Sequence, residues 1–159
     1  PPLFKDEILE NIIPQVSLSS ILEKFNNQTE KEYKTYKDNF LKRFEITQLP
    51  HYLIVYIKRF TKNTFFTEKN RTIVNFPVKN IDFGEYLSDA VKTKHKSTTY
   101  DLIANIIHDG EPDKGIYRMH ILHKLTGQWF EMQDLHVTEI LPEMITLSEA
   151  YIQVYELKT

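Results

Sequence analysis

The sequence predicts an α+β fold with one large, mostly antiparallel sheet and few short helices. From residue 100 to residue 157, apolar segments alternate with turns, the first of them rich in Asp, Gly and Pro, as in an antiparallel meander. Before residue 100, helical spacing is confined to short stretches. These two observations favour a sheet with helical additions, in one domain or part of one.

The N-terminal elements are short. Residues 1–16 contain three prolines, which indicates a lead-in strand or loop. Residues 17–25 predict a helix with one apolar face and a serine N-cap, where Glu23 follows Ser20 by three residues. Residues 26–39 are polar and charged, so we expect an extended and exposed excursion there.

Strand patterns begin near residue 40. Phe40, Lys42, Phe44 and Ile46 fall on one side by period-two counting. The run Tyr52–Ile57 is apolar throughout, which is typical of a central strand covered on both faces. We also expect a turn at 61–64, a strand at 72–76 and a short helix at 85–91.

The remaining sixty residues predict five strands and one helical turn. The helical turn is expected at 146–150. The strands are expected at 100–108, 116–123, 128–133, 136–141 and 151–157.

Composition excludes several classes of protein. With 41% hydrophobic and 13% aromatic residues, the chain has ample apolar area for a folded core, so disorder is not expected. No apolar run approaches the roughly 20 residues that span a bilayer, and no signal-peptide pattern is present. The chain starts at Pro1 without a methionine, so we expect a piece of a longer protein. It contains no cysteine, which excludes disulfides, thiolate metal sites and a cysteine nucleophile in this polypeptide.

Charge is uneven along the chain. Residues 31–71 carry ten basic and four acidic side chains, net +6, although the whole chain has net charge −2. Aromatic residues interleave with these charges at Tyr33, Tyr36, Phe40, Phe44 and Tyr52. The pattern fits a nucleic-acid surface or a solvated face beside an apolar one. Because single lysines alternate with apolar residues, as in half-buried strands, the solvated face is favoured and RNA contact is a minor alternative.

The residues alone reveal no self-sufficient catalytic set. His120 and His123 lie three apart on a predicted strand and so point to opposite faces. A solvated acidic turn is favoured over a calcium loop for the cluster Asp109, Glu111 and Asp113. Zincin, Walker and serine-elbow motifs are absent. We therefore expect scattered histidines without a metal at His51, His95, His108, His120, His123 and His136.

Three separated blocks resemble the ubiquitin-specific protease (ubiquitin carboxyl-terminal hydrolase) family. They are Leu49–Phe60, with Leu-Pro-x-x-Leu through Lys-Arg-Phe; Tyr100–Tyr117, around the family's histidine box; and Trp129–Val137, the strand with the third catalytic residue. The resemblance covers residues 14–157 and implies the C-terminal part of a papain-like domain, spanning 1–159. Its fingers would lie at about 26–48 and most of its palm at 49–157.

The departures from the family pattern imply a pseudoenzyme. In active members the histidine of Gly-His-Tyr is the general base, and that position is Ile116 here, which cannot accept a proton. Gln133 stands at the position of the orienting Asp or Asn, and Asp134 should face the other way on a strand. The paired cysteines that usually hold zinc in the fingers correspond to Tyr33 and Tyr36.

A narrower resemblance points to the inactive branch of the family associated with the spliceosomal tri-snRNP. Four segments carry it: Phe40–Phe44, Thr72–Pro77, Tyr100–Gly110 and Met144–Ile152. It implies a nuclear scaffold for pre-mRNA splicing that contacts tri-snRNP proteins and needs no cofactor. Two alternatives are a weak or partner-completed deubiquitinase, with His108, His120 or His123 as the substitute base, and a ubiquitin-binding reader without catalysis.

Overall fold

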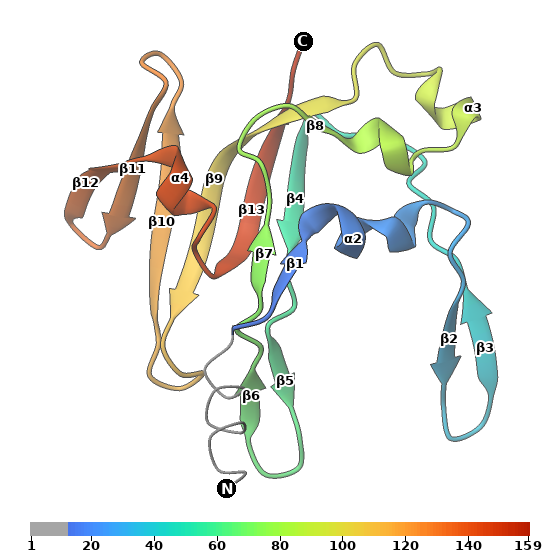
Figure 1. Ribbon diagram of the computed structural model, residues 1–159. Helices are drawn as coiled ribbons and strands as arrows, with labels where there is room; N and C mark the ends of the chain where they lie inside the picture. The colour runs from blue at the N-terminus through green and yellow to red at the C-terminus, as the bar shows by residue number, and fades with distance from the viewer. Residues whose placement is uncertain (1–12) are drawn as a thin grey trace, which may run out of the picture.

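The computed structural model describes residues 13–159, and its main feature is a seven-stranded antiparallel sheet (Figure 1). Neighbouring strands follow the order β12–β11–β10–β9–β13–β4, and β8 pairs with β9 beside this path. The strands are β4 (Tyr52–Tyr56), β8 (Ile81–Asp82), β9 (Thr99–Asp109), β10 (Ile116–His123), β11 (Gln128–Gln133), β12 (His136–Ile140) and β13 (Ala150–Leu157). The predicted α+β architecture is confirmed.

Smaller elements surround this sheet. β1 (Gln15–Ser17) pairs in parallel with β7 (Ile73–Asn75), and two hairpins are formed by β2 (Lys31–Lys34) with β3 (Asn39–Lys42) and by β5 (Phe60–Lys62) with β6 (Thr67–Lys69). The helices are α2 (Leu18–Leu22), η1 (Glu23–Phe25), η2 (Phe83–Tyr86), α3 (Asp89–Lys92) and α4 (Pro142–Ile145). No helix in the described part of the chain is long and apolar enough to cross a membrane.

The core lies on one face of the sheet, beneath α2, β7, η2 and α4. Phe83 of η2 packs edge-on against Tyr100 and Tyr155, with ring centroids 5.1 and 5.7 Å apart. Leu18 and Val74 join the same buried cluster from α2 and β7. Burial of these large side chains is the main favourable contribution to folding.

The prediction that residues 52–57 form a central strand covered on both faces is wrong. β4 is an edge strand of the sheet. Its alternate side chains Tyr52, Ile54 and Tyr56 are 53%, 67% and 56% exposed, whereas Leu53 and Val55 pack against the core. The apolar run therefore has one face on the core and one face open to solvent.

Three helix predictions need correction. The N-cap of α2 is Ser17, whose Oγ accepts a hydrogen bond from the Ser20 backbone, so the Ser20–Glu23 pair does not begin the helix. The expected helix at 85–91 is divided into η2 and α3 because Leu87 is extended. The expected turn at 146–150 comes earlier, as α4, which has a proline in its first turn.

The strand predictions after residue 100 are confirmed to within one or two residues. The topology, however, is not a simple meander. β9 to β12 follow one another across the sheet, and β13 then returns to pair with β9 on its other side. This return places the C-terminal strand inside the sheet, between β9 and the edge strand β4.

Arg59 joins the sheet to the β1–β7 layer. Its side chain is 1% exposed, and its Nε donates to the Ala150 carbonyl at 2.6 Å. One terminal nitrogen donates to the carbonyls of Asn70 and Thr72 at 2.9 and 2.8 Å. Burial lowers the pKa of Arg59, and the nearby Glu149 carboxylate opposes that change. One cation therefore satisfies three backbone acceptors from two segments of the chain, the start of β13 and the segment that leads into β7.

Replacement of this cation should destabilise the fold. Arg59→Met removes charged donors from three carbonyls, and we expect the free energy of unfolding to fall by about 3 kcal/mol or more. Urea unfolding followed through the fluorescence of Trp129 measures the change. Arg43→Met is the matched control, since Arg43 is exposed and lies 3.8 Å from Glu30, and should cost less than about 0.5 kcal/mol. Equal losses in both variants would contradict the assigned role of Arg59.

Candidate functional site

Ile116 and Gln133 lie at the same end of two neighbouring strands. Ile116 is the first residue of β10 and Gln133 the last of β11, and Met119 pairs with Met132 between them. Strand alternation puts both side chains on the face that carries Glu131. Ile116 is 48% exposed. This edge therefore presents an alkyl group and an amide, neither of which can act as a base at neutral pH.

Asp134 was expected on a strand, but the structure places it elsewhere. It occupies the turn between β11 and β12, where its φ angle is 51°, in the left-handed region. Asp tolerates this conformation better than most residues. A turn role accounts for the presence of Asp134, and its side chain is exposed.

Gly115, directly before Ile116, is packed against His108. A Cβ atom at Gly115 would lie 1.9 Å from Nε2 of His108, so no side chain fits there. His108 pairs with Tyr117 across the strands, on the opposite face from Ile116. Burial, and then the positive charge of Lys69, lower the pKa of His108. His108 is thus a neutral packing residue that faces away from the Ile116 edge.

Next to this edge, Arg118 bridges two carboxylates. Its Nε donates to Asp109 at 2.6 Å and a terminal nitrogen donates to Glu131 at 2.8 Å. Burial lowers the pKa of Arg118, but the hydrogen bonds to Glu131 and Asp109 outweigh this effect and raise it overall. Burial conversely raises the pKa of Glu131, and its bonds with His120 and Arg118 bring it below the usual value. Arg118 and Glu131 therefore remain charged at neutral pH.

His120 continues this network into the core. It is 1% exposed, its Nε2 lies 2.9 Å from Glu131, and its Nδ1 lies 3.1 Å from the Asn105 amide nitrogen. Since that amide nitrogen can only donate, Nδ1 accepts and Nε2 carries the proton given to Glu131. Burial lowers the pKa of His120 and outweighs the opposing bond with Glu131. The imidazole is therefore neutral, with both nitrogens engaged.

The hydrogen-bond network reaches β13 through the amide side chains of Asn105 and Gln153. Gln153 donates to Asn105 at 3.4 Å, and Tyr155 donates to Gln153 at 2.7 Å. Asn105 also donates to Ser148, in the loop that follows α4, at 3.0 Å. This network was not predicted from the sequence. Its signal was an amide residue at an inward position in each of two apolar strands.

Asp109 and Glu111, in the acidic turn, pair with different basic side chains. Asp109 binds Arg118, and Glu111 lies 2.5 Å from Arg71. Lys69, whose side chain is 1% exposed, donates to the carbonyls of His108 and Gly110 and lies 2.6 Å from Glu149. The carboxylates are therefore directed to different partners, and the buried lysine fixes the start of the loop that leads to Ile116.

Of the other histidines, His136 lies at this edge, because it pairs with Gln133 across β11 and β12, and it is exposed; His123 and His95 lie elsewhere. His123 is seven residues from Ile116 along β10, about 23 Å at the usual strand rise. His95 accepts from the Leu49 backbone at 3.1 Å, beside α3. Within residues 13–159, no group of three or more His, Asp or Glu side chains could hold a metal ion. The absence of a cofactor stays a prediction.

Tyr33 and Tyr36, at the positions of the family's zinc ligands, have different surroundings. Tyr33 lies on β2 and stacks on Phe40, with ring centroids 6.2 Å apart. Tyr36 lies in the hairpin turn and is 93% exposed. The division of the chain into fingers and palm stays a prediction.

Known proteins are similar to this chain in both sequence and fold. Residues 7–155 match the family described as Ubiquitin carboxyl-terminal hydrolase. The chain belongs to this family.

Two curated relatives and one solved structure are similar to the chain over nearly all of its length. "Ubiquitin carboxyl-terminal hydrolase 39" of Mus musculus is 68% identical over 155 residues, covering 98% of this chain and 28% of the relative. "Probable mRNA-splicing protein ubp10" of Schizosaccharomyces pombe is 41% identical over 161 residues, covering 98% and 31%. The crystal structure of an essential yeast splicing factor matches with a TM-score of 0.64 and 24% identity, covering 92% of this chain and 31% of that one.

The chain thus spans less than a third of the length of these relatives. The match to ubiquitin carboxyl-terminal hydrolases confirms the resemblance on which the site positions were assigned. The name of the Schizosaccharomyces pombe relative describes a probable mRNA-splicing protein, and the likeness to the yeast structure is one of fold.

The proton assignment in the network predicts a pH dependence of stability. The unfolded chain binds a proton on His120 near pH 6.5, whereas the folded chain does so only at lower pH, because burial lowers the pKa. The stabilisation is thus complete above that pH and is lost as pH falls below it. Urea unfolding between neutral and mildly acidic pH should show this decline, and His120→Gln should reduce it. Nitrogen NMR should find protonated Nε2 and bare Nδ1, and a cationic ring at pH 6.5 would contradict the assignment.

Proposed function

We propose that this chain is part of a catalytically inactive ubiquitin carboxyl-terminal hydrolase that acts in the nucleus as a protein scaffold of the spliceosomal tri-snRNP. The observation that carries the proposal is Ile116 at the family's general-base position. Without a proton acceptor there, an upstream cysteine would stay a weak thiol nucleophile. The splicing relatives support the spliceosomal assignment.

The surroundings of the other histidines support the absence of catalysis. His120 has both ring nitrogens in hydrogen bonds inside the core. His108 faces the opposite side of the sheet from Ile116, and His123 lies at the far end of β10. A substitute base has to lie within hydrogen-bond reach of the nucleophile, at a site that also positions the substrate. None of the three meets this requirement at the Ile116 edge.

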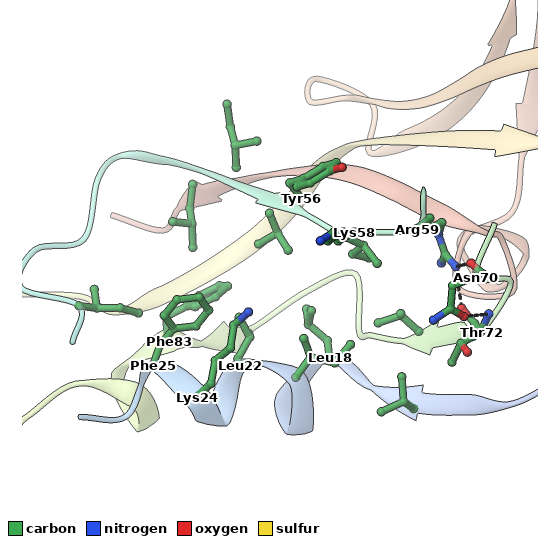
Figure 2. A pocket seen from close by; sticks show the side chains of 18 residues that line it. Leu18, Leu22, Lys24, Phe25, Tyr56, Lys58, Arg59, Asn70, Thr72 and Phe83 are labelled. Carbon is green, nitrogen blue, oxygen red and sulfur yellow. Dashed lines mark hydrogen bonds between the residues drawn. The ribbon is translucent and has the colours of Figure 1, made fainter. Parts of the chain in front are cut away.

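An open protein-docking surface supports the scaffold role. Within the described residues β4 pairs only with β13, so its other edge has free backbone donors and acceptors. Figure 2 shows the groove of about 530 Å³ beside this edge, between β4 and the α2–η1 segment, lined by Leu18, Leu22, Phe25, Tyr56 and Phe83 among others. A free strand edge beside an apolar groove suits an extended segment of a partner protein.

A ubiquitin-binding reader is the second candidate function. A hollow between β5–β6 and the acidic turn is lined by aromatic side chains, including Phe60, Phe66, Tyr117 and Tyr151. It lies on the face opposite Ile116, next to the loop of the lost histidine box. Saturable binding of labelled ubiquitin would favour this candidate, and no shift up to millimolar ubiquitin would eliminate it.

The first test measures catalysis by the full-length protein with ubiquitin–rhodamine. Loss of a base that acts as a unit with its nucleophile costs on the order of 10⁴- to 10⁶-fold in kcat, so we expect no turnover above the blank. An active family member in the same assay is the control. Turnover within about a hundredfold of that enzyme would overturn the proposal. Loss of such turnover in His108→Ala would then identify a substitute base.

The second test measures docking in RNase-treated nuclear extract by quantitative mass spectrometry. The full-length protein should enrich tri-snRNP proteins, and Ile54→Asp should reduce this enrichment several-fold, because it places a charge on the open face of β4. Leu125→Asp is the control, since Leu125 is 94% exposed in the β10–β11 turn. Enrichment of ubiquitin conjugates without spliceosomal proteins would favour the reader instead.

A further inference from the structure

Four aromatic rings form a continuous stripe along the β2–β3 hairpin and the end of η1. Phe25 packs edge-on against Phe44 at 6.0 Å, and Phe44 against Tyr33 at 6.4 Å. Tyr33 is stacked on Phe40, with an interplanar angle of 11°. Tyr36 extends the aromatic series at the hairpin tip, where it is 93% exposed. Figure 1 shows that this hairpin projects away from the main sheet.

Lysine ammonium groups lie over the rings of this stripe. The Nζ of Lys42 lies 4.8 Å from the Tyr33 centroid and 4.9 Å from that of Phe40. Lys31 lies 5.8 Å from the Tyr33 centroid. Further cation–ring pairs join Lys24 to Phe25 and Lys37 to Tyr36. Aromatic and cationic groups therefore alternate along the stripe.

The cations and rings are concentrated on one side of the hairpin. Lys31 pairs with Lys42 across the strands, and Tyr33 pairs with Phe40, so alternation puts all four on one face. The other face carries Glu32, which lies 3.8 Å from Lys34. The acidic charge of the hairpin strands thus sits away from the aromatic stripe.

We propose that the stripe binds single-stranded nucleic acid, which goes beyond the protein contacts of the proposed function. Phe40 and Tyr36, which are 40% and 93% exposed, offer ring surfaces on which bases stack, and the flanking ammonium groups meet the phosphates. An acidic protein segment would satisfy the lysines but leave the row of rings without stacking partners. A duplex presents phosphates but not its base faces. Both chemical features of the stripe are met together only by an unpaired strand.

The test uses full-length protein and a fluorescein-labelled oligouridine of about 12 nucleotides, followed by fluorescence anisotropy. The four lysines of the stripe, set opposite phosphates, predict a slope of log K against log salt of about −2.8, at about −0.7 per phosphate. The double variant Lys31→Glu/Lys42→Glu should lose roughly tenfold or more in affinity and bring the slope toward about −1.4. Lys79→Glu/Lys114→Glu, with exposed lysines outside the hairpin, is the charge-matched control and should bind as wild type.

Stacking is tested separately with Tyr36→Ala, an exposed change at the tip that leaves the hairpin packing intact. It should weaken oligouridine binding roughly fivefold or more without changing the salt slope. Binding that ignores both the lysine and tyrosine variants would overturn the proposal. Equal affinity for an oligoglutamate peptide would also overturn it, in favour of an acidic protein partner. Preference for a duplex of equal length would exclude base stacking and would likewise overturn the proposal.

Discussion

The arrangement of the sheet depends on one buried chain of hydrogen bonds. It runs from Tyr155 through Gln153, Asn105 and His120 to Glu131, and so crosses β13, β9, β10 and β11. Each donor in this chain has a defined acceptor, which leaves a single protonation state. A slip of any strand by one residue would turn its polar group to the other face and leave its partners unsatisfied. The chain therefore selects one register for four strands, which apolar packing alone would specify less strictly.

This network also shows which residues of the two strands at the Ile116 edge hold the sheet together. The register of β10 and β11 is held by Arg118, His120 and Glu131, behind the edge where Ile116 and Gln133 stand. Gly115 retains its close packing on His108 although the next residue is not a histidine. Because the positions at the edge contribute little to these contacts, their substitution is compatible with an intact sheet. The contacts that stabilise β10 and β11 thus involve other residues than Ile116 and Gln133.

Sequence patterns predicted the elements better than their environment. The bounds of β10 and β11 were predicted without error because clear turns flank them. β4 was predicted to be a central strand, but it lies at the edge of the sheet. An apolar sequence indicates that a strand is partly buried, but it does not show which element covers each face. The family resemblance located Ile116 and Gln133, but the network around them required knowledge of which strands are neighbours. Only the fold brings Asn105 beside His120 and Gln153.

The two proposed contact surfaces differ in charge. Residues 31–71 have net charge +6, whereas residues 72–159, which supply most of the sheet, have net charge −5. The groove beside β4 is mainly apolar, and its free edge offers backbone hydrogen bonds that are insensitive to charge. The hairpin stripe presents rings and ammonium groups with its acidic residue turned away. A polyanion is thus attracted to the hairpin and repelled by the acidic sheet, while a protein strand at β4 depends on shape and burial. The two surfaces meet at Phe25, which lines the groove and ends the stripe, so a protein strand and a nucleic acid would bind to adjoining parts of this face through different chemistry.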